Sequence, residues 1–301
     1  MGVDVITPVA DLVRSWGFDV RHPVSQRSTN NVVVWLSPSP VLAKISTELD
    51  RANRELAIAR ELVELAAPVV PPFERGIDQP VIMSERIVTF WQYEPQNAVI
   101  ASNAHQIAEY LFRLHSCLAS IRDRAALPSF ADPLMSAVSG LERPEFAPAL
   151  AEADRALLRE TLVDGVVRLA RITGSERVIH GSPHRFNILN VDAAPRFIDF
   201  ETVECGPLEW DLAHLEPEVA DHYPGEFDHQ ALELCRVLVS AATSTWCWEG
   251  LERGSDMQSH AEHHLEVVRS ARAQNRPIRE PEGAARCSRP QTISRLRPTS
   301  Q

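Results

Sequence analysis

The order of apolar and polar residues divides the chain into a strand-rich first part and a longer helical part. Two β-branched runs at 31–36 and 41–46, separated by Ser-Pro-Ser-Pro, are typical of a β-hairpin. A third apolar run at 81–89 predicts a further strand. Between these strands, apolar residues recur with helical spacing over 50–66, where nearby prolines end the pattern. A short helix is also predicted at 8–16, with the preceding threonine as its N-cap.

Helical spacing dominates the chain after Glu94. Apolar residues recur there at steps of four and three, which predicts long amphipathic helices. The predicted helices cover 107–121, 154–172 and 227–246. One short pair of strands, at 188–191 and 196–200, interrupts them. The pattern therefore predicts an α+β protein made of two lobes, a small strand-rich N-lobe and a larger helical C-lobe.

We divide the chain into an N-lobe at 1–94, a C-lobe at 95–268 and a tail at 269–301. The tail is rich in proline, arginine and serine and has almost no large apolar side chains. Such a composition does not bury enough apolar surface to offset the entropy of ordering, so we expect a disordered basic tail.

Composition and charge exclude several classes of protein. The formal net charge of −11 argues against a general nucleic-acid-binding protein, which usually carries a net basic surface. No run approaches the ~20 apolar residues of a membrane span, and the N-terminus lacks the pattern of a signal peptide. The five cysteines are widely spaced and form no C-x-x-C pair. We therefore expect a cytoplasmic protein without a nucleic-acid or membrane partner.

Lysine is almost missing from the chain: of its 30 lysine and arginine residues, only Lys44 is a lysine. No glycine lies near Lys44, so it does not belong to a phosphate-binding P-loop. The chain has no G-x-G pair either, which excludes the dinucleotide-binding fingerprint. Any chemistry that needs a lysine ammonium group therefore depends on Lys44.

The densest group of polar residues lies in 178–201, V-I-H-G-S-P-H-R-F-N-I-L-N-V-D-A-A-P-R-F-I-D-F-E. If a three-residue loop at 192–194 joins two regular strands, Asn187 and Asp199 face each other across the open end of the hairpin. Directly opposed residues have Cβ atoms ~5 Å apart. An amide oxygen and a carboxylate at that distance fit Mg²⁺, which takes few protein oxygens together with substrate phosphates. Polar residues that merely flank a turn are the alternative interpretation.

Three neighbouring features favour the metal-binding interpretation. His180 and Gly181 precede the hairpin and form a loop that can bend sharply. Asp211 follows it at the start of a predicted helix, where a carboxylate can accept backbone amides. Lys44 lies on a predicted strand, with Glu55 on the next helix as a possible ion-pair partner.

The motifs H-G-S-P-H-R-F-N, F-I-D-F-E and E-W-D-L-A together resemble the aminoglycoside phosphotransferase family of the protein-kinase-like fold. The usual family pattern is H-G-D-x-H-x-x-N, I-D-[FWY]-[ED] and W-D-[LP]-A. The resemblance extends weakly over 24–242, through A-K-I, V-I-M-S-E and L-F-R-L-H-S. It implies a two-lobed phosphotransferase that uses ATP or GTP with Mg²⁺ and phosphorylates a hydroxyl group of a small-molecule acceptor.

The resemblance also implies roles for individual residues. Lys44 would contact the α- and β-phosphates of the nucleotide, with Glu55 orienting it. Asn187 and Asp199 would bind Mg²⁺. The hinge against the nucleobase would be formed by residues 83–88, including Met83, Ser84 and Glu85. His180 and Asp211 would support the catalytic loop from the interior of the protein.

The chain departs from the family pattern at Ser182, where the family has the aspartate that accepts the proton of the substrate hydroxyl. A serine hydroxyl is not a base near neutral pH. In one interpretation Ser182 orients the acceptor, His184 or a neighbouring carboxylate takes the proton, and transfer is weakened or altered. In the other, the protein is a pseudokinase that binds nucleotide without transferring phosphate.

Other motifs have weaker functional interpretations. H-A-E-H-H at 260–264 has a spacing that suits a transition metal, although a solvated helix end explains it as well. The loop at 25–31, which would cover the nucleotide, contains no glycine and is equally an ordinary polar turn. Ser182 between two histidines suggests a serine hydrolase, but the chain has no G-x-S-x-G elbow.

Overall fold

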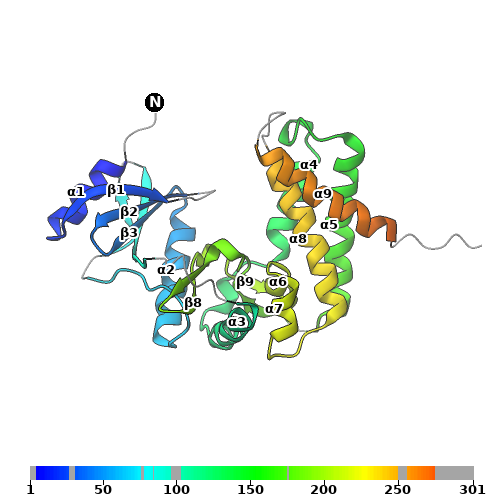
Figure 1. Ribbon diagram of the computed structural model, residues 1–301. Coiled ribbons are helices and arrows are strands. Elements are labelled where there is room, and N and C mark those ends of the chain that lie inside the picture. Colours follow the sequence, from blue (N-terminus) through cyan, green and yellow to red (C-terminus); the bar gives the residue numbers. More distant parts are fainter. Residues whose placement is uncertain are drawn as a thin grey trace, which may run out of the picture.

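The computed structural model describes residues 5–26, 31–75, 78–83, 85–95, 103–174, 176–249 and 256–274. In these residues an antiparallel sheet forms one lobe and a larger helical part forms the other (Figure 1). The predicted two-lobed α+β class is therefore confirmed. Residues 1–4, part of the loop at 25–31, Ser84 and most of the predicted tail lie outside the described residues.

The N-lobe is built on a five-stranded sheet in the order β1-β2-β3-β5-β4, with all neighbouring strands antiparallel. The strands are β1 (Val20–Gln26), β2 (Val32–Pro38), β3 (Val41–Ser46), β4 (Val81–Met83) and β5 (Arg86–Gln92). The β2–β3 hairpin confirms the predicted pair of strands. Helix α1 (Ile6–Ser15) covers one face of the sheet, where Val9 and Val13 share a core with Val34 and Leu36.

Two sequence predictions for this lobe were wrong. The apolar run at 81–89 is not one strand but the β4–β5 hairpin, because the chain reverses around Glu85, whose φ is 67°. The polar residues Ser84, Glu85 and Arg86 interrupt the apolar run at this reversal, but they include none of the glycine, proline or asparagine residues that usually mark a turn. Helix α1 begins at Ile6 rather than at Pro8, and its N-cap Val5 makes no side-chain cap hydrogen bond.

Helix α2 (Leu49–Glu64) follows β3 directly and packs against both lobes of the protein. Its buried residues include Glu55, Leu56 and Leu62. Leu56 and Leu62 pack in the central core, which also contains residues of the C-lobe strands. The same helix therefore carries a buried carboxylate toward β3 and an apolar face toward the C-lobe.

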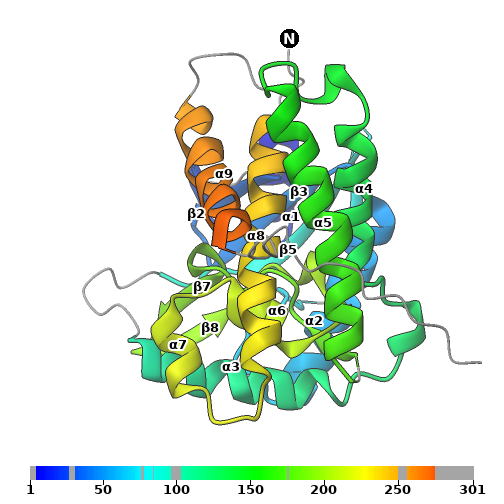
Figure 2. The same cartoon turned by 90° about the vertical axis from the view of Figure 1, so that its right-hand side faces the viewer.

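The C-lobe contains five longer helices within the described residues. They are α3 (Ala104–Leu118), α4 (Ala131–Leu141), α5 (Glu152–Ile172), α8 (His229–Trp248) and α9 (Asp256–Gln274). Helices α4, α5, α8 and α9 lie side by side at the end of the molecule away from the sheet (Figures 1 and 2). The predicted helices at 107–121, 154–172 and 227–246 are confirmed with small shifts of their ends, whereas α4 and α9 were missed.

Short elements between α5 and α8 carry the polar motifs. The strands form two pairs, β6 (Arg177–Ile179) with β9 (Glu204–Gly206), and β7 (Ile188–Val191) with β8 (Ala194–Phe197). Two short helices follow, α6 (Leu208–Ala213) and α7 (Pro217–His222). The β7–β8 hairpin confirms the predicted pair of strands, although β8 ends at Phe197 rather than at residue 200. These elements lie against α3, between the sheet and the outer helices (Figure 1).

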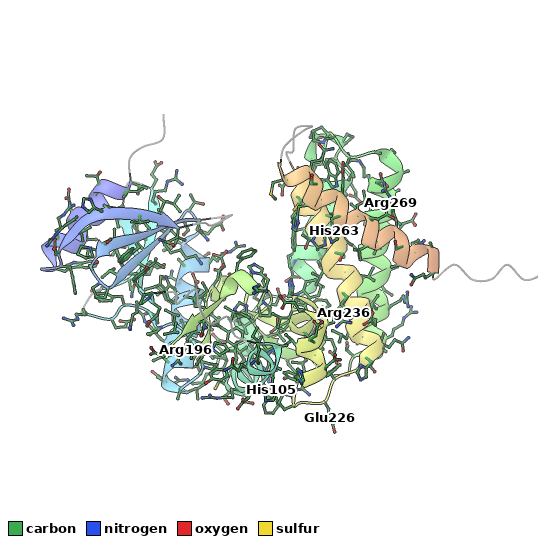
Figure 3. The ribbon with its side chains drawn as sticks, in the orientation of Figure 1. His105, Arg196, Glu226, Arg236, His263 and Arg269 are labelled. Atoms are coloured by element: carbon green, nitrogen blue, oxygen red, sulfur yellow. The ribbon has the colours of Figure 1, made fainter. Side chains whose placement is uncertain are left out.

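The structure corrects the start of the predicted tail. Residues 269–274 continue α9 rather than beginning a disordered segment. Arg269, labelled in Figure 3, extends from α9, and its Nη2 lies 2.7 Å from Oδ1 of Asp154 on α5. Arg272 Nη2 lies 3.1 Å from Oε2 of Glu160 on the same helix. Ion pairs between neighbouring helices hold these arginines, and composition alone does not reveal such pairs.

Within the described residues, no helix has both the length and the apolar character needed to cross a bilayer.

Candidate active site

Lys44 lies on β3 and points toward the C-lobe. It is paired with Thr89 in the sheet register, between core residues Ala43 and Ile45 on the other face. Its Nζ lies 2.9 Å from Oε1 of Glu55, as the sequence predicted. The same Nζ lies 2.6 Å from Oδ1 of Asp199. One side chain of the N-lobe is thus bound to carboxylates of both lobes.

A third carboxylate, Glu201, also contacts Lys44, with Oε2 at 3.0 Å from Nζ. Burial by itself lowers the pKa of Lys44, but the three surrounding carboxylates outweigh it and raise that pKa above its usual range. Burial raises the pKa of Glu55, although Lys44 opposes the shift. Lys44 is therefore a permanent cation in a site with an excess of carboxylates, and such a site attracts further positive charge.

Glu201 was not among the predicted site residues, although it is the last residue of the F-I-D-F-E motif. It is buried, and its Oε2 accepts a hydrogen bond from Nδ2 of Asn31 at 3.2 Å. Nη1 of Arg51 on α2 lies 3.9 Å from its Oε1. Glu201 thus links the start of β2 and the start of α2 to the C-lobe. The acidic residue at the end of the motif was the available signal.

The predicted register of the β7–β8 hairpin is wrong by one residue. The loop between β7 and β8 contains two residues, Asp192 and Ala193, both with positive φ (51° and 62°). Two positive φ values define a type I′ turn, which usually needs Asn or Gly, so Ala193 hid it from sequence analysis. Asn187 is consequently opposite Ile198, whose amide donates to the Asn187 carbonyl at 3.0 Å. Asp199 follows in the left-handed conformation, with φ 69° and ψ 63°.

Asn187 is buried and held in one orientation. Its Nδ2 donates to the carbonyl of Ser182 at 3.0 Å, and its backbone amide donates to the carbonyl of His184 at 2.7 Å. Because the amide nitrogen is used in this way, the Oδ1 atom is left as the group that can bind a cation. The predicted role of Asn187 as a metal ligand fits this geometry and stays a prediction.

The donor set around Asp199 suits a hard divalent cation. Ligand oxygens of Glu55, Asp199 and Glu201 lie within 4.8 Å of one another, the one such group of three found among the described residues. The Asp199 side chain is 34% exposed, whereas those of Glu55 and Glu201 are only 3% and 6% exposed. Carboxylate and amide oxygens are what Mg²⁺ and Ca²⁺ prefer. Asp199 is the member of the group that an incoming cation can reach.

The buried Asp211 supports the loop that carries Ser182, as the sequence predicted. The Asp211 carboxylate accepts the backbone amides of His180 and Gly181, each at 2.8 Å, and Nε2 of His115 at 2.9 Å. Burial alone would raise the pKa of Asp211, but these hydrogen bonds outweigh it and lower that pKa. His115 in turn bonds the hydroxyl of Tyr223 at 2.8 Å. His115 and Tyr223 were missed because they come from distant helices.

Gly181 is required by its close contacts. Its φ is 86°, and a Cβ atom at this position would lie 2.1 Å from the carbonyl oxygen of Thr202. Its own carbonyl accepts a hydrogen bond from Nε1 of Trp210 at 2.9 Å. His180 is fully buried beside it, and its Nε2 bonds the carbonyl of Ile198 at 3.0 Å. The loop is therefore fixed to the β8–β9 segment on one side and to α6 on the other.

Ser182 and His184 lie at the exposed end of this loop. Both side chains are half-buried. Nε2 of His184 lies 3.4 Å from Nδ2 of Asn187, and its Nδ1 is buried without a hydrogen-bond partner. Burial lowers the pKa of His184. The imidazole is therefore neutral near pH 7.

The structure does not bring Met83 and Glu85 to this group. They lie at the turn of the β4–β5 hairpin, on the edge strand of the sheet. The chain leaves the N-lobe instead at the end of β5, after Gln92. There the ring of Tyr93 stacks on Trp35 of β2, with centroids 4.1 Å apart and planes 6° from parallel. The predicted hinge at 83–88 is therefore not where the chain passes between the lobes.

The histidine run at 260–264 is remote from these groups. His263, labelled in Figure 3, lies on α9 at the end of the molecule opposite the sheet. The rings of His260 and His264 meet edge to face with centroids 4.7 Å apart, one helical turn apart. The run does not contribute to the three-residue group of possible metal ligands found in the described chain.

A two-lobed fold in which one buried lysine bridges a helix glutamate and an aspartate of the opposite lobe is the arrangement of a kinase-like phosphotransferase. The model of the phosphotransferase enzyme family, APH, matches residues 20–236, and the chain belongs to this family. The protein is accordingly a phosphotransferase of the kind that acts on a hydroxyl group of a small molecule. No curated protein matches the chain.

Solved structures with this fold cover nearly the whole chain. The GDP and kanamycin complex of APH(2")-IIia has a TM-score of 0.69 and 17% identity over 88% of this chain and 98% of its own. Amicoumacin kinase hAmiN, in complex with AMP-PNP, Ca²⁺ and Ami, has a TM-score of 0.68 and 10% identity, covering 89% and 96%. Choline kinase LicA from Streptococcus pneumoniae has a TM-score of 0.65 and 14% identity, covering 88% and 98%. The TM-scores confirm the predicted protein-kinase-like fold.

Proposed function

We propose that the protein transfers the γ-phosphoryl group of ATP or GTP, bound with Mg²⁺, to a hydroxyl group of a small molecule. The observation that carries this proposal is the contact of Lys44 with both Glu55 and Asp199. In kinase-type enzymes this lysine–glutamate pair and the metal-binding aspartate must both be in place for transfer. The solved structures with this fold include complexes with AMP-PNP and GDP, which supports a nucleotide as the donor.

In this proposal Lys44 binds the α- and β-phosphates, and Glu55 fixes the position of the ammonium group. The nucleobase lies against the segment after β5, at 92–95, rather than at Met83, Ser84 and Glu85. The Trp35–Tyr93 stack and the hydrogen bond from the Tyr93 amide to the Pro40 carbonyl, at 2.9 Å, support this position because they make the segment rigid.

Asn187 and Asp199 are the proposed metal ligands, with Glu201 as a further candidate. A divalent cation held there neutralises negative charge on the phosphates. Lys44 lies 2.6 Å from Asp199 and 3.0 Å from Glu201, so it occupies the same carboxylates that a cation would share. We infer that nucleotide phosphates draw the ammonium group partly away from these carboxylates and leave their oxygens open.

Ser182 replaces the expected aspartate, and we assign proton acceptance to His184. Its ring is two residues from Ser182 and bonds the side chain of Asn187. The lowered pKa of His184, caused by burial, keeps the imidazole unprotonated near pH 7. Ser182 would orient the acceptor hydroxyl by hydrogen bonding. Since transfer proceeds through a loose transition state, positioning and charge supply most of the rate and a weaker base is tolerated.

Ser182 also favours a second candidate function, a pseudokinase that binds nucleotide without transfer. The two are separated by following γ-labelled ATP with the protein and a panel of amines and sugars that bear hydroxyl groups. Transfer of label to an acceptor, lost in a His184→Ala variant that still binds Mg·ATP, is the expected result. Tight Mg·ATP binding without labelled product would identify the pseudokinase. A protein that binds no nucleotide would contradict both functions.

We place this activity in the cytoplasm, where ATP and GTP are available. Cys117, Cys205, Cys235 and Cys247 are all free thiols in the described residues, and two of them are buried. Unpaired thiols are typical of a reducing compartment.

A further inference from the structure

Phe186 is the most exposed large apolar side chain in the described part of the chain. Its surface is 86% exposed, against 62% for Ile82, which is the next in order. Phe186 lies in the 3₁₀ turn Arg185–Asn187, between the proposed base and the proposed metal ligand. Single exposed apolar residues are common on protein surfaces, but an open phenylalanine beside reacting groups presents its ring to whatever binds there.

The backbone on both sides of this ring is fixed. Nη1 of Arg185 lies 3.3 Å from Oε1 of Glu216 at the start of α7. On the other side Asn187 is buried and bonded through its amide and its side chain to His184 and Ser182. The Phe186 ring meets the His184 ring edge to face, with centroids 6.1 Å apart. Phe186 is therefore held outward by an ordered loop, which reduces the entropy lost when a ligand covers it.

We propose that Phe186 is an apolar platform for the acceptor, and that the acceptor carries a ring or other apolar group next to the hydroxyl that is phosphorylated. The proposal rests on the proposed phosphotransfer and names its acceptor class. Ser182 and Asn187 bracket the place where the hydroxyl meets the phosphates, and Phe186 lies one residue from Asn187. An apolar group beside that hydroxyl covers the ring and excludes water from both surfaces.

Two other occupants fit the surroundings of Phe186 less well. The nucleobase is excluded in this proposal because it lies at the segment after β5, at the opposite end of the phosphates. A protein partner would need a surface of ~800 Å² on each side. One phenylalanine beside the charged and exposed Arg185 does not provide an apolar surface of that size.

The test compares two acceptors that differ only in their apolar group, phenyl β-D-glucoside and methyl β-D-glucoside. Transfer from γ-labelled ATP is measured with the full chain, together with Mg·ATP binding by calorimetry. We expect kcat/KM to be about 10-fold to 100-fold higher for the phenyl compound, since each 1.4 kcal/mol of apolar contact is tenfold. Phe186→Ala should remove this preference by raising KM for the phenyl compound with little change in kcat.

Phe186→Trp should retain the preference, because it keeps a large ring at the same place. Val167→Ala, at a 46% exposed apolar position on the outer helix α5, is the matched control and should leave both KM values unchanged. Three results would contradict the proposed role of Phe186. They are equal kcat/KM for the two glucosides, transfer to neither glucoside while Mg·ATP still binds, and a preference for the phenyl compound that persists in Phe186→Ala. Loss of Mg·ATP binding in the wild type instead contradicts the proposed function itself.

Discussion

Nζ of Lys44 lies 2.6 Å from Oδ1 of Asp199, a residue 155 positions later in the chain. The contact joins the middle of the N-lobe sheet to the C-lobe hairpin. Glu55 and Glu201 complete the surroundings of the ammonium group, so one cation is shared by three carboxylates. Because an unpaired charge in such a site is costly, the lysine and its carboxylates depend on one another.

Lys44→Arg is expected to fold but to lose roughly 10²-fold in kcat/KM. The planar guanidinium group is wider than an ammonium group and does not fit the same three carboxylates, so it displaces the phosphates by ~1 Å. Thermal unfolding and steady-state transfer kinetics check this. Arg51→Lys is the control, since Arg51 is 47% exposed and lies 3.9 Å from Glu201 at the edge of the site. Wild-type kinetics in Lys44→Arg would show that the single lysine has no special role.

Asp199→Asn is expected to abolish Mg²⁺-dependent nucleotide binding while the chain remains folded. The substitution keeps the shape of the side chain and removes one negative charge from the group that also contains Glu55 and Glu201. Calorimetric titration with ATP, with and without Mg²⁺, measures the effect. Asp192→Asn, in the turn of the same hairpin, should bind like the wild type. An unchanged affinity for Mg·ATP in Asp199→Asn would refute the metal assignment.

Ser182→Asp is expected to raise kcat by less than about 10²-fold, because a general base contributes about 10²–10⁴-fold and His184 already supplies part of that contribution. The side chain at this position is half-buried beside His184, and the backbone of the loop is fixed by Asp211. Single-turnover transfer of labelled phosphate checks the prediction. Ser139→Asp on the exposed face of α4 should have no effect. A gain of about 10²–10⁴-fold in Ser182→Asp would show that no base acts in the wild type and would contradict the assignment of proton acceptance to His184.

Asp211→Asn is expected to destabilise the fold by about 3–5 kcal/mol at pH 7, because His115 and two backbone amides lose a buried carboxylate. The pKa of Asp211 is lowered in the folded state, so its contribution is present above the unfolded value near 3.8 and is lost as the pH falls below it. Urea unfolding from pH 3 to pH 7 should therefore show the two proteins converging at low pH. The exposed Asp221→Asn should match the wild type throughout, and parallel curves for Asp211→Asn and wild type would contradict the prediction.

Glu204 has the opposite dependence on pH. Burial is the main reason that its pKa is raised to about 9, with Asp211 and Asp132 adding to the shift. Between pH 4.5 and about pH 9 the folded state therefore holds a proton that the unfolded state has released. As the pH rises through this range, the free energy of unfolding falls by at most about 1.4 kcal/mol per pH unit. Glu204→Gln should remove this fall and be more stable than the wild type at pH 8. Urea unfolding at pH 5 and pH 8 tests it, with the exposed Glu176→Gln as control; no gain at pH 8 would refute it.

Much of the site was visible in the sequence because the chemistry is concentrated in short motifs. The Lys44–Glu55 pair followed from a strand, a helix and the distance between them, and the contacts of Asp211 with the loop followed from its place at a helix start. Glu201 was present in a quoted motif but received no role. It contacts Lys44 two residues after the left-handed Asp199, and nothing in the local composition encodes that backbone conformation.

Backbone turns also limited what could be predicted from the sequence. They affect the register of the β7–β8 hairpin and the position of the segment between the lobes. The sequence predicts Asn187 opposite Asp199 and a hinge at 83–88. Two turns without their usual residues, at Ala193 and Glu85, shifted both predictions. A positive φ outside glycine is imposed by the strands on either side, so the tertiary structure chooses it and the residue merely tolerates it.

The sequence by itself determined the class of fold, the order of the elements and the residues that carry charge, because hydrophobic period and motif composition are local properties. The tertiary structure alone decided which carboxylates share Lys44, that Asn187 faces Ile198, and that Phe186 remains uncovered beside the site. These are contacts, or missing contacts, between segments far apart in the chain. They depend on how helices and strands pack around common cores, and packing is set by all the segments together.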